Sequence, residues 1–129
     1  MSRIKIGFDI GGVLTKYPSF FRDLILALQE SQRFDVHVLS DIPDQALCVK
    51  MVHDNGFRLH ESNIHSCDYS KYGQLCKAKK GEEIGLDALI DDYIGYVACG
   101  PEVRLLLMPD PHTPYNNEEW QDTTTESRL

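Results

Sequence analysis

Residues 4–15 have the sequence Ile4-Lys5-Ile6-Gly7-Phe8-Asp9-Ile10-Gly11-Gly12-Val13-Leu14-Thr15, and they predict a buried strand that runs into a glycine turn. The apolar side chains over residues 4–8 are typical of a strand. Asp9 follows at the carboxyl end of that strand, which is where open α/β sheets bind their ligands. Gly11 and Gly12 allow the backbone to turn sharply and to approach a ligand closely. The stretch therefore predicts a ligand site built around one carboxylate.

Polar groups with a similar context recur later in the chain. Ser40 ends a short apolar run, and the pair Asp91-Asp92 ends another. Lys77 precedes the second run, near the start of a predicted helix. Because the carboxyl ends of adjacent parallel strands meet at one edge of a sheet, we expect these groups to converge on Asp9. Carboxylates that hold Mg²⁺, beside a hydroxyl and an ammonium that hold phosphate oxygens, would account for this combination.

The order of predicted elements alternates between strands and helices, which indicates an α/β fold with a mainly parallel sheet. The expected strands cover residues 4–8, 34–40, 57–60, 86–90 and 103–108. The expected helices begin near Pro18, at residues 41–43, at residue 72 and after Asp92. The first of these helices is expected to bury an apolar stripe that includes Phe20. Residues 1–108 are therefore predicted to form one domain, followed by a polar and partly disordered tail over residues 109–129.

The order of these groups along the chain is Asp9, Ser40, Lys77 and then the pair Asp91-Asp92. In type and order they resemble the four motifs of the haloacid dehalogenase-like superfamily, most of whose members are Mg²⁺-dependent phosphatases. The resemblance covers residues 4–108 and implies a Rossmann-like three-layer sandwich with a mainly parallel five-stranded sheet. It implies that Asp9 is the nucleophile and that three groups bind phosphate: Ser40, Lys77 and Gly12. It assigns the Mg²⁺ ligands to three carboxylates and one backbone carbonyl, those of Asp9, Asp91, Asp92 and Gly11. Ser40 and Lys77 are also implied to take part in catalysis.

The chain departs from the superfamily pattern at one position. Phosphatases of the superfamily usually carry a second aspartate two residues after the nucleophile, where it protonates the leaving oxygen and then activates water. This chain has Gly11 there, similar to a minority of members that begin with an Asp-x-Gly-Gly turn. General acid–base catalysis contributes roughly a hundred- to ten-thousand-fold. We therefore expect a slow phosphatase or, as the alternative, an inactive relative that binds phosphate and Mg²⁺ or another protein.

The spacing between motifs leaves no room for an inserted cap domain. Residues 15–39 hold one helix with its loops, and residues 41–76 hold ordinary crossover elements. The active site should then be open, and capless members of the superfamily resemble one another in acting on large substrates or in borrowing a neighbouring subunit as a lid. The resemblance thus implies a phosphorylated small molecule or nucleotide, or a macromolecular phosphoester, as substrate, and allows for a homo-oligomer.

Composition restricts the partners and the compartment. The 129 residues carry a net charge of −7, which argues against non-specific binding to nucleic acid or to an anionic membrane. The four cysteines have no disulfide-scaffold spacing and suit a reducing compartment. Since neither a signal peptide nor a membrane span is visible, a cytoplasmic protein is expected. Pro114-Tyr115-Asn116 and Trp120 are similar to a phrase near the end of deoxyribonucleotidase-like members of the superfamily.

Structural interpretations of the same residues remain open. Ser40 and the pair Asp91-Asp92 would suit helix caps, and Lys77 lies in a lysine-rich stretch typical of a solvated face. We favour the functional interpretation because paired carboxylates at one strand end repel each other without a cation. Three other lysines are alternatives for the motif position: Lys71, Lys79 and Lys80.

Two other interpretations are disfavoured. A zinc site would have to be assembled from His60, His65, Cys67 and Cys76, whose spacing matches no compact ligand pattern. A response-regulator receiver also combines acids, a hydroxyl and a lysine, but its acidic pair comes first, whereas here it comes last. Three aromatic residues would suit stacking on a base, although packing or surface roles are the simpler interpretation for each: Tyr93, Tyr96 and Trp120.

Overall fold

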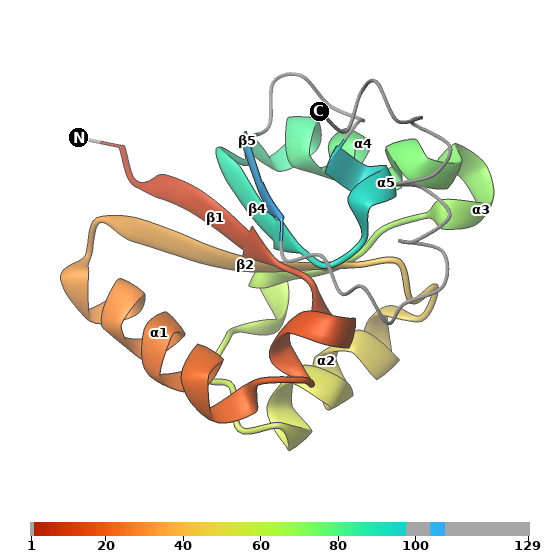
Figure 1. Ribbon diagram of the computed structural model, residues 1–129. Coiled ribbons are helices and arrows are strands. Elements are labelled where there is room, and N and C mark those ends of the chain that lie inside the picture. Colours follow the sequence, from red (N-terminus) through yellow and green to blue (C-terminus); the bar gives the residue numbers. More distant parts are fainter. Residues whose placement is uncertain (1, 98–103, 108–129) are drawn as a thin grey trace, which may run out of the picture.

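The structure is a computed structural model that describes residues 2–97 and 104–107, and it has a parallel sheet flanked by helices (Figure 1). The strands are β1 (Ile4–Phe8), β2 (Phe34–Ser40), β3 (Ile64–Ser66), β4 (Ala88–Asp91) and β5 (Arg104–Leu107). Their order in the sheet is β3-β2-β1-β4-β5, and each neighbouring pair is parallel. The predicted α/β class with a parallel sheet is therefore confirmed. In the described residues no cap domain is evident between the strands.

The helices are α1 (Pro18–Ser31), α2 (Gln45–Asp54), α3 (Tyr69–Tyr72), α4 (Cys76–Ile84) and α5 (Ile94–Val97). Two clusters of buried side chains join them to the sheet. One cluster joins β1 and β2 to α1 and α2, whereas the other joins β2 and β4 to α4 and Tyr96. Val38 belongs to the first cluster and Leu39 to the second, because successive strand side chains point to opposite faces. Burial of apolar surface on both sides of β2 fixes its place inside the sheet.

The apolar stripe of α1 was predicted partly wrongly. Pro18 starts the helix as expected, and Phe21 and Ile25 are buried. Phe20, in contrast, is 62% exposed and packs its ring edge-to-face against Phe21. Successive residues of a helix point about 100° apart, so Phe20 and Phe21 cannot both face the sheet within one narrow apolar stripe of α1.

The predicted third strand, residues 57–60, is also wrong. Phe57 and Leu59 are buried, so the alternating pattern is real, but these residues form a loop and the strand is β3. The side chain of Asn63 donates hydrogen bonds to the Val36 carbonyl at 2.8 Å and to Asp35 at 2.9 Å. These bonds fix the approach of the chain to β2, and pairing begins only at the next residue, Ile64.

The helix boundaries differ from the predicted ones for local reasons. α2 begins at Gln45 rather than at residues 41–43, because the Asp44 side chain accepts a hydrogen bond from the Leu47 amide and caps the helix. Residues 72–84 are not one helix, since Gly73 has a φ of +57° and separates α3 from α4. Among the described residues, no helix has both the length and the apolar character needed to cross a bilayer. The predicted tail, residues 109–129, with its nucleotidase-like phrase lies outside the described residues.

Two histidines join β2 to β3. His37 Nε2 lies 3.0 Å from Asp35 Oδ2, and His37 Nδ1 lies 3.0 Å from His65 Nε2. Because the carboxylate only accepts, His37 donates from Nε2, and a neutral His37 then accepts at Nδ1 from His65. Burial, followed by the neighbouring His37, lowers the pKa of His65 from 6.5 to about 4. The fold therefore favours the neutral ring of His65.

We expect this arrangement to make the fold less stable in mild acid. In the unfolded chain His65 takes up a proton as the pH falls through about 6.5, whereas in the folded chain it does so only near pH 4. The unfolded state therefore binds more protons in this window, and the free energy of unfolding falls as the pH drops from 6.5 to 4. Denaturant unfolding of wild type and His65→Gln at several pH values measures the effect as the difference between the two. Identical pH dependence in the two proteins would contradict it.

Candidate functional site

The central strand β1 brings the predicted site residues together. Phe8 of β1 pairs with Val38 of β2 on one side and with Ile90 of β4 on the other. Ser40 and Asp91 therefore reach the same edge of the sheet as Asp9, which directly follows β1. The Asp9 amide donates to the Ile90 carbonyl at 2.9 Å and thereby fixes the start of the turn. The expected convergence of the strand ends is thus present.

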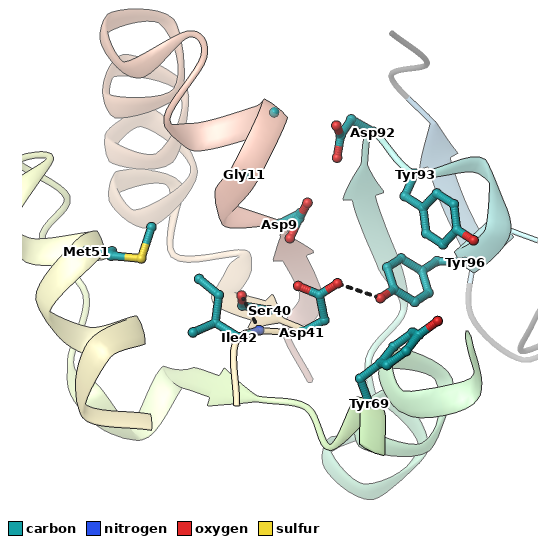
Figure 2. A pocket seen from close by; sticks show the side chains of 11 residues that line it. Asp9, Gly11, Ser40, Asp41, Ile42, Met51, Tyr69, Asp92, Tyr93 and Tyr96 are labelled. Carbon is teal, nitrogen blue, oxygen red and sulfur yellow. Dashed lines mark hydrogen bonds between the residues drawn. The ribbon is translucent and has the colours of Figure 1, made fainter. Parts of the chain in front are cut away.

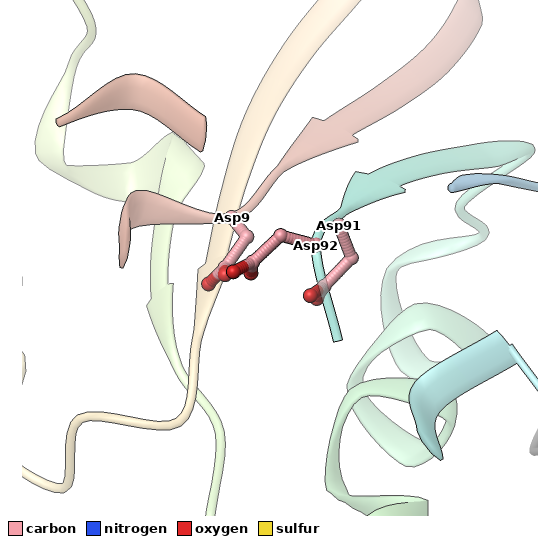
Figure 3. Close-up of side chains that lie close together, drawn as sticks. All are labelled: Asp9, Asp91 and Asp92. Carbon is pink, nitrogen blue, oxygen red and sulfur yellow. The ribbon is translucent and has the colours of Figure 1, made fainter. Parts of the chain in front are cut away.

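Three carboxylates form the centre of this edge. Asp9, Asp91 and Asp92 each offer an oxygen within 4.8 Å of the others, and all three residues are buried (Figure 3). Within residues 2–97 and 104–107 this is the one group of three or more potential metal-binding side chains. Buried carboxylate oxygens at this spacing are the ligands that a hard divalent cation such as Mg²⁺ takes. The donor set therefore fits a hard divalent cation.

Lys77 balances part of this negative charge. It comes from α4, its side chain is 1% exposed, and its ammonium donates to Asp9 Oδ1 at 2.8 Å and to Asp91 Oδ2. The same ammonium lies 4.6 Å from the centre of the Tyr96 ring, within the range of a cation–π contact. A buried ammonium with two carboxylate partners has a fixed position, so Lys77 holds Asp9 in one orientation.

The electrostatics of the cluster follow from burial and from Lys77. Burial raises the pKa of Asp9 to about 6, although the Lys77 ammonium lowers it. Burial likewise raises the pKa of Asp91 to about 6, and it raises that of Asp92. Burial alone would lower the pKa of Lys77, but the carboxylates of Asp9 and Asp91 raise it well above its usual value. Lys77 is therefore charged at neutral pH.

Of the four candidate lysines, the structure brings Lys77 to the carboxylates. Lys80 instead pairs with Glu83 at 3.1 Å, and the ammonium of Lys71 lies 5.1 Å from the centre of the Tyr72 ring. Ser40 does not cap α2, which Asp44 caps; its hydroxyl accepts from the Ile42 amide at 3.1 Å, and the residue lines the cavity beside Asp9. Of the residues considered for zinc, His65 contacts His37, and Cys67 and Cys76 are buried.

The two turn glycines have different roles. Gly11 has φ −69° and ψ 134°, an ordinary extended conformation, and a Cβ at this position would meet no atom within 4 Å. Gly12 has φ +74°, and its Cβ would lie 2.1 Å from Asp92 Oδ2. The turn therefore packs directly against the carboxylate of Asp92, which only glycine permits at this position. Gly11, in contrast, faces open space.

A cavity of about 640 Å³ opens over the cluster (Figure 2). It is lined by residues from both sides of the sheet edge: Asp9, Gly11, Gly12, Ser40, Asp41, Ile42, Met51, Tyr69, Asp92, Tyr93 and Tyr96. Sequence reasoning missed Asp41, which follows Ser40 and accepts a hydrogen bond of 2.8 Å from the Tyr96 hydroxyl. Its position next to a motif residue at a strand end was the signal that could have identified it. Tyr96 thus connects Asp41 to Lys77.

Comparisons of this chain with protein-family models, with curated proteins and with solved structures found no match. Membership of the haloacid dehalogenase-like superfamily therefore stays a resemblance of motifs.

The contrast between the glycines leads to a matched prediction. Gly12→Ala should lower the free energy of unfolding by about 1–3 kcal/mol, because alanine is strained at positive φ and its Cβ would displace Asp92. Gly11→Ala should be neutral or stabilising by up to about 1 kcal/mol, since its backbone suits any residue. Denaturant unfolding of both variants measures the difference. Equal stability of the two variants would show that the turn has another conformation.

Proposed function

We propose that this protein is a Mg²⁺-dependent phosphate monoester hydrolase that works through an aspartyl-phosphate on Asp9. The observation that carries the proposal is the position of Asp9, whose buried carboxylate touches Lys77 and faces a cavity shared with Ser40 and Asp92. The proposal includes membership of the haloacid dehalogenase-like superfamily, with its five-stranded, Rossmann-like three-layer sheet and no cap. It also includes a cytoplasmic location, which buried free cysteines suit.

The residues that would hold Mg²⁺ are Asp9, Asp91 or Asp92, and the backbone carbonyl of Gly11. The clustering of three buried carboxylates supports this assignment, because one ammonium leaves their charge only partly balanced. When bound, the ion offsets the repulsion between the carboxylate nucleophile and the phosphate and polarises a phosphoryl oxygen.

The chain's own groups then act on the phosphate. A carboxylate oxygen of Asp9 attacks phosphorus and forms an acyl-phosphate bond, while the bond from phosphorus to the ester oxygen breaks and its electron pair leaves with that oxygen. The Ser40 hydroxyl, the Lys77 ammonium and the Gly12 amide are the donors proposed for the equatorial oxygens. Lys77 donates as a cation, and its contact with Asp9 keeps the nucleophile oriented. Water then attacks phosphorus, the bond from phosphorus to the Asp9 oxygen breaks, and inorganic phosphate leaves while a proton of the water passes to solvent and the Asp9 carboxylate is regenerated.

The missing carboxylate at Gly11 determines the expected rate. No side chain at this position can protonate the departing oxygen, so esters with poor leaving groups should react slowly. Aryl phosphates release a stabilised phenolate, which needs little help from a proton donor. Their turnover should therefore be reduced least by the missing acid.

The alternative function is that of an inactive relative that binds phosphate and Mg²⁺ or serves as an interaction module. Gly11 is the specific observation that favours it. Both functions share the ligand cluster and differ in whether Asp9 becomes phosphorylated.

The test of the proposed activity is a phosphatase assay with an aryl phosphate, with and without Mg²⁺. Wild type should hydrolyse the substrate in the presence of Mg²⁺, and Asp9→Asn should lose at least a hundredfold in turnover because the amide is a poor nucleophile. Asp35→Asn, which lies outside the cavity, serves as a matched control for loss of one carboxylate. Activity of Asp9→Asn close to that of wild type would contradict the nucleophile assignment.

Calorimetric titration with Mg²⁺ distinguishes the two functions. An enzyme should show both binding and turnover, whereas an inactive relative should show binding alone. The double variant Asp91→Ala, Asp92→Ala should bind Mg²⁺ far more weakly than wild type, because two of the three carboxylates are removed. Undiminished affinity in this variant would place the ion elsewhere.

Gly11→Asp should raise the turnover of an alkyl phosphate by about a hundredfold. Its φ of −69° suits any residue and a Cβ meets open space, so the variant should fold and place its carboxyl group at the cavity. Gly11→Asn has the same shape but donates no carboxyl proton, and it should show no gain. A folded Gly11→Asp protein that binds Mg²⁺ without any gain in turnover would count against the missing-acid explanation.

A further inference from the structure

One wall of the cavity is made of tyrosine. Tyr69 from α3 and Tyr93 and Tyr96 from the segment after β4 lie on one side of the carboxylates, and Ile42 and Met51 lie on the other (Figure 2). The mechanism above uses none of these five side chains to contact phosphate. The cavity therefore has an aromatic wall and an apolar wall on either side of its charged floor.

The polar ends of the two inner tyrosines are already engaged by the protein. The Tyr96 hydroxyl donates to Asp41 at 2.8 Å, and the Tyr93 hydroxyl accepts from Gln74 Nε2 at 2.7 Å. The two rings pack edge-to-face with their centres 4.8 Å apart, an arrangement that fixes both. Tyr96 is buried and supports the half-buried Tyr93, so the pair offers a ligand the accessible ring surface of Tyr93, held in place at little cost in side-chain entropy.

Tyr69 differs because it is 47% exposed, at the mouth of the same cavity. A cavity of about 640 Å³ lies in the range of sites that enclose a whole organic ligand, roughly 300–1,000 Å³. A phosphate group on the carboxylate floor would fill only a part of it. The remaining volume lies between the tyrosines and the apolar side chains of Ile42 and Met51.

We infer that the organic group of the substrate carries a planar aromatic ring, which packs against the tyrosine wall while the phosphate contacts Asp9. This inference rests on the proposed function, because it places the phosphate at that site. Flat rings gain from tyrosine faces and edges, and from the thioether of Met51 opposite them. An uncharged ring is favoured over an anionic one, because Asp41 and Asp92 also line the cavity. A nucleoside monophosphate and a small benzyl-type or aryl phosphate share this chemistry.

Two pairs of non-hydrolysable phosphonates test the inference by calorimetry on the full chain with Mg²⁺. Benzylphosphonate and cyclohexylmethylphosphonate carry a six-carbon ring on the same linker, which is planar and aromatic in the first and puckered and saturated in the second. The isosteric phosphonates of adenosine 5′-monophosphate and ribose 5-phosphate differ in the presence of the base. We expect the aromatic member to bind at least about tenfold tighter in one pair, and that pair identifies the source of the ring. Equal affinities within both pairs would overturn the inference.

The outcomes separate this inference from the proposed function. If the protein prefers the aromatic phosphonate but shows no Mg²⁺-dependent turnover, the aromatic site is supported and the proposed hydrolase activity is overturned. Turnover without ring preference would retain the hydrolase and overturn the aromatic site. Failure of all four phosphonates to bind would overturn the inference directly.

Variants of the exposed tyrosine complete the test without disturbing the core. Tyr69→Leu should reduce the ring preference several-fold, whereas Tyr69→Phe should keep it, because the ring and not the hydroxyl makes the contact. Tyr72→Leu is the matched control, since Tyr72 is also exposed on α3 but does not line the cavity. An unchanged preference in Tyr69→Leu together with a loss in Tyr72→Leu would overturn the placement of the ring.

Discussion

The contact between the Lys77 ammonium and the carboxylates of Asp9 and Asp91 is the interaction on which the rest of the site depends. Three carboxylates buried at one sheet edge repel each other, and the cost of desolvating them is large unless a cation is present. Lys77 supplies one positive charge. It comes from α4, which packs on the face of the sheet opposite to α1 and α2. The surplus negative charge that remains is what makes the site suitable for a divalent cation.

Lys77 is itself held by its neighbours. Tyr96 lies against the ammonium and donates its hydroxyl to Asp41, and Tyr93 packs on the Tyr96 ring. Two of the tyrosines that line the cavity, Tyr93 and Tyr96, therefore also help to hold Lys77 in place. The shape of the cavity and the orientation of Asp9 therefore depend on the same few packed side chains.

The glycine turn places a second constraint on the site. Gly12 adopts a positive φ and allows the carboxylate of Asp92 to approach its Cα closely, so the turn and the acidic pair fit as one unit. Gly11 has neither constraint, and its lack of a side chain is not required by the backbone. The backbone and its neighbours would therefore accept a side chain at position 11, and packing does not explain why this residue is a glycine.

Much of this arrangement was predictable from local pattern, and the failures have a common cause. Short apolar runs correctly located the strands that end near Asp9, Ser40 and Asp91, because the pattern of apolar residues indicates which side chains are buried. The same pattern misplaced the third strand, since Phe57 and Leu59 are buried from a loop. Periodicity identifies buried side chains but not the backbone partner, which for β3 depends on contacts of Asn63 with β2.

The sequence by itself determined the chemistry at the strand ends: a carboxylate, a hydroxyl and an acidic pair in that order, with two glycines after the first carboxylate. Only the tertiary structure decided which lysine completes the site, because the contact between Lys77 and Asp9 joins residues 68 positions apart. It also decided that Gly12 rather than Gly11 is sterically required, and that Tyr69, Tyr93 and Tyr96 share one cavity. Each of these facts depends on which elements pack together in space, and local sequence patterns carry no record of such long-range contacts.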